Sequence, residues 1–87
     1  MMADAKTVTR LLKTARGQLD GILKMVEEDR YCIDISQQLM ATEAILNRTN
    51  KEILAAHLKH CVQEAETPEE RSQKVDEFIG TLGKVLK

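Results

Sequence analysis

Three side chains with metal-binding chemistry lie in the middle part of the chain. Cys32 stands alone, whereas His57 and Cys61 are four residues apart. Residues at this spacing share one face of a helix, so an imidazole and a thiolate can bind the same ion. Sulfur ligands select Cu(I) or Zn(II) over hard cations, and a structural zinc site takes four protein ligands. A set of two thiolates and one imidazole therefore favours copper.

The positions of these residues along the chain decide where a shared site can form. Residues 31–62 read as one long helix, in which Cys32 and His57 would lie about 37 Å apart. One chain cannot close this distance, but two antiparallel copies can, because the start of one helix then lies beside the end of its partner. The spacing predicts a site between subunits. Buried thiols and a core histidine are the alternative that the spacing leaves open.

Apolar residues recur at three- and four-residue steps over most of the chain. They predict an all-α fold of three helices, at about 6–29, 31–64 and 68–86, in a single domain of residues 1–87. The third helix has a clear start, because Thr67 and Pro68 suit the N-cap and first helical positions and an acidic residue follows in the capping-box position. A core built from 87 residues is marginal, so oligomerisation is expected.

The second helix has a stripe that suits pairing with another helix. Leu39, Leu46 and Ile53 follow each other at intervals of seven, and Asn50 falls within the same stripe. This spacing is typical of helices that pack lengthwise, and a buried Asn often fixes their register. The stripe thus predicts an extended helix partner.

Several classes of protein are disfavoured. There is no Gly-rich phosphate loop and no Ser–His–Asp constellation, so we do not expect an enzyme. No apolar run approaches the ~18 residues of a membrane span, and the first residues do not resemble a signal peptide. We expect a cytoplasmic protein, where cysteines serve as metal ligands or reactive thiols more often than as disulfides.

Charge is unevenly distributed along the chain. The net charge is −1, but residues 1–24 hold five cations and two carboxylates, a local charge of +3. Such a basic surface can bind phosphates although the whole chain is nearly neutral. A solvated helix face is the simpler alternative.

Three blocks of sequence carry a resemblance to a known family. They are R-G-Q-L-D-G-I at 16–22, Y-C-I-D-I-x-x-Q at 31–38 and H-L-x-x-C-V at 57–62. Together they resemble the copper-sensing operon repressor (CsoR) family of bacterial transcription regulators, over residues 8–82. The resemblance implies an antiparallel dimer with a four-helix bundle core, a dimer of dimers, and release of operator DNA when an inducer binds.

The resemblance also implies roles for individual residues. Cys32, His57 and Cys61 match the metal ligands of the copper sensors, and Tyr31 and Glu77 match residues that surround those ligands. Nickel and cobalt sensors instead add an N-terminal His and replace the second Cys by His. Persulfide sensors keep both cysteines but typically lack the His. The resemblance implies Cu(I) as inducer, with a reactive-sulfur sensor using both cysteines as the alternative.

DNA contacts are implied by matching positions on the first helix and the middle of the second. The implied residues are Arg10, Lys13, Arg16, Gln18, Arg48 and Lys51. So few cations per chain require a tetramer to sum their charges, and binding should weaken steeply with salt. A structural helical module that binds no DNA is the alternative from a different functional class.

Overall fold

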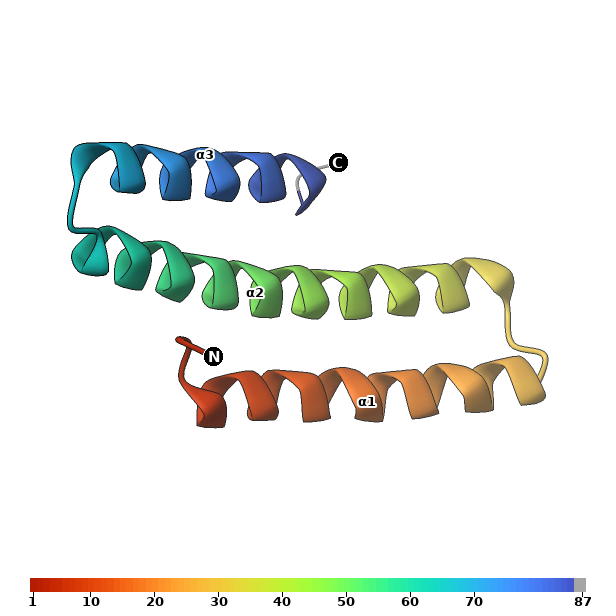
Figure 1. Cartoon of the computed structure of the whole chain (residues 1–87). Coiled ribbons are helices and arrows are strands. Elements are labelled where there is room, and N and C mark those ends of the chain that lie inside the picture. Colours follow the sequence, from red (N-terminus) through yellow and green to blue (C-terminus); the bar gives the residue numbers. More distant parts are fainter. Residues whose placement is uncertain (86–87) are drawn as a thin grey trace.

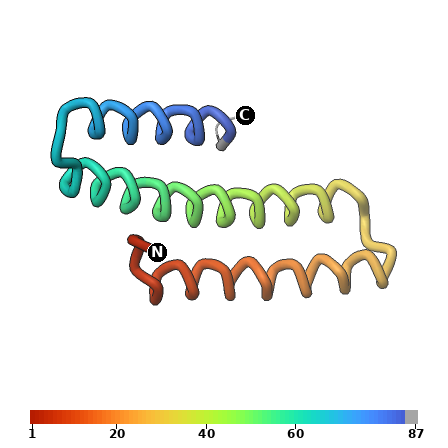
Figure 2. Tube along the Cα trace, viewed as in Figure 1, coloured from red at the N-terminus to blue at the C-terminus, as the bar shows by residue number. Residues whose placement is uncertain are grey.

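A computed structural model describes residues 1–85 as three helices in one flat layer. They are α1 (Ala5–Glu27), α2 (Cys32–Glu64) and α3 (Pro68–Val85), and they confirm the expected all-α fold. The central helix α2 runs antiparallel to both neighbours (Figures 1 and 2). The Cα atoms span 57 × 27 × 12 Å, and the smallest extent is close to the width of one helix. Both broad faces of α2 are therefore left uncovered by the chain's own helices.

The turn between α1 and α2 begins two residues before the end of the predicted first helix. Asp29 has a positive φ of 52°, and the N–H of Arg30 donates to the carbonyl of Met25 at 3.0 Å. The N–H of Asp29 donates to the carbonyl of Val26 at 3.1 Å, which completes a Schellman motif. This turn ends α1 at Glu27 and reverses the chain direction. At the other end of the chain, Leu86 of the predicted third helix lies outside the described residues.

The start of α3 is capped by side chains on both sides of Pro68. The Thr67 hydroxyl accepts a hydrogen bond from the N–H of Glu70 at 3.1 Å. The Glu70 carboxylate in turn accepts from the N–H of Glu66 at 3.1 Å, one residue earlier than in a standard capping box. The cap fixes the point at which the chain leaves α2 and folds back beside it.

Asp4 fixes the start of α1. Its carboxylate accepts hydrogen bonds from the hydroxyl of Thr7 at 2.6 Å and from the N–H of Thr7 at 3.2 Å. These bonds, the side-chain bond first, lower the pKa of Asp4 below its ordinary value of 3.8. The cap therefore stabilises the helix at neutral pH, and its contribution is lost as pH falls through the lowered pKa. The segment before α1 is thus tied to a defined helix start.

The core lies between α1 and α2 and contains two threonines. The buried apolar side chains are on α1, namely Val8, Leu11, Ala15 and Ile22. On α2 the buried residues are Thr42 and Thr49, with exposed fractions of 2% and 3%. Both hydroxyls donate to carbonyls one turn back in their own helix, which satisfies them inside the core. The side of α2 that faces α1 is therefore different from its leucine stripe.

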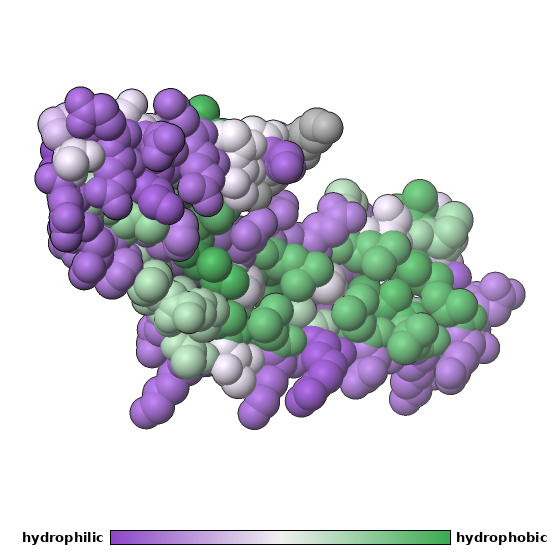
Figure 3. All heavy atoms as spheres, viewed as in Figure 1, coloured by the Kyte–Doolittle hydropathy of each residue, from purple (hydrophilic) through white to green (hydrophobic). Residues whose placement is uncertain are grey.

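A large apolar surface remains exposed on one broad face of the layer. Figure 3 shows hydrophobic residues gathered over α1 and α2 on the side facing the viewer. The exposed large apolar residues within these two helices are Leu12, Leu19, Leu23, Val26, Ile33, Leu39, Met40 and Leu46. Contiguous apolar surfaces of this kind mark protein interfaces or membrane contacts. Within the described residues, no helix combines the length and apolar character required to cross a membrane.

Candidate functional site

The last turns of α2 hold two candidate metal ligands side by side. The Nε2 atom of His57 lies 3.4 Å from the Sγ atom of Cys61. Metal bonds of about 2.0 Å to nitrogen and 2.3 Å to sulfur can be made from one ion to two atoms at this separation. His57 is exposed and Cys61 is half-buried, so both can be reached from outside the chain. The pair is suited to bind one soft ion.

The third candidate ligand lies at the opposite end of the same helix. Cys32 is the first residue of α2 and is exposed. Because α2 continues without a break to Glu64, Cys32 and His57 are about 37 Å apart. Within the described part of one chain, no three His, Cys, Asp or Glu side chains gather closely enough to hold a metal ion. A single chain therefore provides the two parts of the predicted trio at separate places.

The three candidate ligands share one face of α2. Cys32, Leu39 and Leu46 are spaced by seven residues, His57 follows Leu46 by eleven, and Cys61 follows by four more. All of these steps return to nearly the same side of a helix with 3.6 residues per turn. Leu39 and Leu46 belong to the exposed apolar surface. The stripe thus presents leucines at its centre and metal-binding groups at both ends.

Tyr31 and Glu77 lie near different ends of this stripe. Tyr31 directly precedes Cys32 and is exposed. Glu77 is on α3, where it lines a cavity of about 320 Å³ together with His57. Its carboxylate lies 3.9 Å from the Nζ atom of Lys74. Each of the two residues thus accompanies a different part of the predicted trio.

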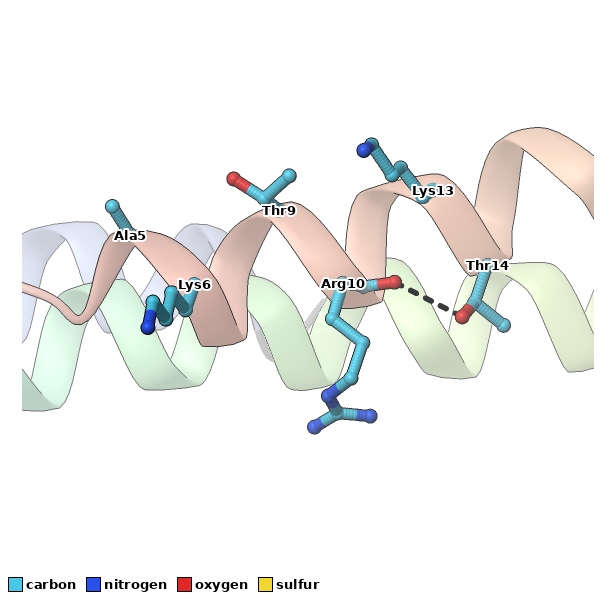
Figure 4. Close-up of a pocket in the computed structure, with 6 residues that line it drawn as sticks. All are labelled: Ala5, Lys6, Thr9, Arg10, Lys13 and Thr14. Atoms are coloured by element: carbon cyan, nitrogen blue, oxygen red, sulfur yellow. Dashed lines mark hydrogen bonds between the residues drawn. The ribbon is translucent and has the colours of Figure 1, made fainter.

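The cations of α1 form an open basic surface. Arg10, Lys13 and Arg16 are exposed, and among the described residues no carboxylate lies within salt-bridge distance of them. Figure 4 shows the Arg10 and Lys13 side chains extending to opposite sides of α1. Lys6 lines the same hollow and extends the surface by one turn, although sequence reasoning did not place it among the DNA contacts. Its spacing of four residues from Arg10 is the signal that identifies it.

Arg48 and Lys51 of α2 are exposed at the level of these cations. Gln18 and Thr42 touch across the two antiparallel helices, so a residue six positions after Thr42 lies level with one six positions before Gln18. Arg48 is therefore level with the middle of the α1 basic surface. It also follows Leu46 by two residues, which turns it about 200° away from the apolar stripe. The basic side chains of α2 point away from the candidate metal ligands.

Gln18 is part of the contact between α1 and α2. Its Oε1 atom accepts a hydrogen bond of 2.9 Å from the hydroxyl of Thr42, and the Gln18 side chain is half-buried. The carbonyl end of this amide is therefore engaged inside the chain. Only its N–H₂ group is left to meet a phosphate or a base.

Replacing Thr42 by Val tests the structural role of this contact. The change keeps the shape of the side chain but removes the hydroxyl that Gln18 needs, so we expect a loss of about 1 kcal/mol in unfolding free energy. Thr49→Val is the matched control, because its hydroxyl bonds only to Ile45 of its own helix. Urea unfolding followed by circular dichroism measures both variants. An equal loss in the two would show that the Gln18 bond adds nothing.

A comparison with known protein families bears directly on this arrangement. Residues 4–84 match the sequence model of a family described as metal-sensitive transcriptional repressors. The chain belongs to this family. Its members are repressors and not enzymes, which agrees with the absence of a catalytic constellation in the sequence, and the resemblance to the CsoR family is confirmed.

Individual relatives give further detail. The chain is 44% identical over 71 residues to the copper-sensing transcriptional repressor CsoR of Mycobacterium ulcerans, a match that covers 82% of this chain and 61% of that protein. This chain thus spans less than two thirds of that relative's length.

Two solved structures share the fold. The copper-sensing repressor CsoR with Cu(I) from Geobacillus thermodenitrificans superposes with a TM-score of 0.80 at 34% identity, covering 94% of this chain and 85% of that one. The nickel-responsive regulator InrS gives the same TM-score at 24% identity, covering 98% and 96%. Because a nickel-responsive protein has the same fold, the choice of metal depends on side chains and not on the helices.

Proposed function

We propose that this chain is a DNA-binding transcriptional repressor that releases operator DNA when Cu(I) binds between two subunits. The observation that carries the proposal is the His57–Cys61 pair, with 3.4 Å between Nε2 and Sγ, at one end of an exposed apolar stripe that has Cys32 at its other end. A half-site at each end of one surface is what an antiparallel pair of helices requires. The copper-sensing names of the relatives support the choice of ion.

The exposed apolar surface is proposed to hold two chains together. Two copies that pack through this surface around a two-fold axis place α2 of each chain antiparallel to the other, in a four-helix bundle with both α1 helices. Leu39 and Leu46 would lie near the centre of this contact. Each Cys32 would then meet the other subunit's end of the stripe, which completes two equivalent sites.

The donor set fits Cu(I). Cys32 and Cys61 supply thiolates and His57 supplies an imidazole, and this soft combination disfavours hard cations. Three ligands leave a structural zinc site one short. When bound, copper supplies a link between two subunits. Tyr31 arrives with Cys32 and Glu77 lies beside His57, so they would enclose the ligands from both subunits.

DNA binding is assigned to the surface away from the apolar stripe. Arg10, Lys13, Arg16, Arg48 and Lys51 are exposed there, and Gln18 contributes its free amide nitrogen. Two dimers are proposed to associate in the cytoplasm so that the cations of four chains act on one operator. The inducer changes operator affinity only as far as it binds two tetramer geometries unequally.

The proposed inducer can be tested with fluorescently labelled DNA from upstream of the chain's own gene. Adding Cu(I) to the protein–DNA complex should lower the fluorescence anisotropy to that of free DNA. His57→Ala should still bind copper through its two thiolates, but release DNA weakly. A polysulfide that releases DNA while Cu(I) does not would support the reactive-sulfur sensor. Absence of any salt-sensitive DNA binding would support the structural module.

A further inference from the structure

We propose that Met1 and Met2, which precede α1, supply a thioether sulfur to the copper site at His57. The proposal rests on the function proposed above, because it adds a ligand to the same ion. It concerns a part of the chain that the Cys32, His57 and Cys61 pattern does not include.

The methionines and His57 line the same cavity. This cavity of about 320 Å³ opens between the first residues, α2 and α3. Its lining consists of Met1, Met2, Ile53, Leu54, His57, Glu77, Phe78 and Thr81. In Figures 1 and 2 the first residues turn back from α1 to lie beside α2. Residues 1 and 2 are thus placed at the metal-binding end of α2, far from Cys32 of the same chain.

The position of the two methionines is restricted by the helix that follows. Asp4 is fixed by two hydrogen bonds to Thr7, so the chain leaves α1 at a defined point. Met2 is only two residues before Asp4, and its Cα can lie no farther than about 7 Å from that of Asp4. The flexible side chain of Met can adapt within this range. His57 thus has a tethered sulfur donor on the cavity side.

The chemistry of the thioether suits the ion. Soft thioether sulfur selects Cu(I), and it carries no proton to release and no charge to add. The proposed trio of ligands leaves room for one more donor. Met1 and Met2 keep 72% and 50% of their surface exposed, so burial in the single chain does not account for their position.

A purely apolar role for the methionines is the competing explanation. Met1 and Met2 could simply cover Ile53, Leu54 and Phe78 in the cavity. Leucine would do this equally well, since Met-to-Leu changes conserve volume and apolar character. Only a metal ligand requires the sulfur atom. The two explanations therefore differ in what replacement by leucine does to copper binding.

Selenium can report on the proposed bond directly. Selenomethionine protein with Met25→Leu and Met40→Leu carries selenium only at residues 1 and 2. After loading with one Cu(I) per chain, X-ray absorption at the selenium edge should show scattering from a bonded copper atom. Scattering at the copper edge should show nitrogen and sulfur from the other ligands in the same sample.

Copper affinity provides a second readout. A Met1→Leu/Met2→Leu variant, released from a cleavable fusion so that it needs no start methionine, should lose about 10- to 100-fold in Cu(I) affinity against a competing chelator. Met40→Leu is the matched control, because Met40 is 57% exposed on α2 and about 26 Å from His57. Its copper affinity should equal that of the wild type.

The outcomes separate this proposal from the proposed function. Copper bound with nitrogen and sulfur signals but no selenium–copper scattering, together with unchanged affinity in the double variant, would overturn the thioether ligand and leave the Cys–His–Cys site standing. Failure of the wild-type protein to bind Cu(I) at all would overturn both.

Discussion

Cys32→Ser and Cys61→Ser proteins are each expected to lose Cu(I) affinity by more than about 100-fold, and mixing the two should restore tight binding to some sites. The first figure exceeds the usual effect of losing a residue that only supports a ligand. The recovery follows from the separation of the two half-sites on α2. In a mixed dimer, the intact Cys32 of one chain meets the intact His57 and Cys61 of the other.

The extent of recovery is set by symmetry. Random exchange of subunits makes half of the dimers mixed, and each mixed dimer has one complete site of two, so about a quarter of all sites should bind tightly. Chelator competition measures this fraction, and native mass spectrometry verifies the exchange. A mixture of Cys61→Ser with His57→Ala is the control, since both changes affect the same half-site and no complete site can form. Equal recovery in the control would rule out a site shared between subunits.

Arg48→Ala is expected to weaken operator binding by tenfold or more. The change removes one exposed cation from each of four chains, so the loss is repeated within one complex. Every phosphate contact that disappears should lower the slope of log affinity against log salt concentration by about 0.9. Fluorescence anisotropy at several salt concentrations measures both the affinity and the slope.

Arg71→Ala provides the matched control for this prediction. Arg71 is an exposed cation on α3, outside the surface formed by α1 and the middle of α2. Its removal changes the net charge by the same amount, but we expect it to leave the salt slope as it is. If the two variants weaken binding equally, net charge and not a defined surface governs the interaction with DNA.

The helices and the metal-binding pair could be predicted because they depend on local spacing. The i, i+4 spacing of His57 and Cys61 survives in the structure as a 3.4 Å approach. The Thr67–Pro68 start of α3 also follows from local rules, since the capping bond joins residues three apart. Such features are fixed within one or two helical turns, where sequence patterns are informative.

The side of α2 that packs against α1 could not be predicted in the same way. Apolar periodicity selects Leu39 and Leu46 as the main stripe, yet Thr42 and Thr49 are buried and the leucines are exposed. The stripe is the stronger pattern because it serves a surface outside the single chain. Gln18 was assigned to DNA from its position on a polar face, and only the fold shows its bond to Thr42.

Residues 1–3 lay beyond the reach of sequence reasoning for a different reason. They carry no periodic pattern, and nothing in their order indicates that they return to α2. Their place beside His57 follows from the direction in which α1 begins at Asp4 and from the antiparallel arrangement of α1 and α2. A search for ligands limited to His and Cys would also pass over the methionines.

The most direct test of the account is to measure both sides of the coupling between copper and DNA. Operator affinity is determined with and without one Cu(I) per chain, and Cu(I) affinity is determined for free and operator-bound protein. We expect copper to weaken operator binding, and the operator to weaken copper binding by the same factor, as linkage requires. Equal operator affinities for the copper-free and the fully copper-loaded protein would contradict the account.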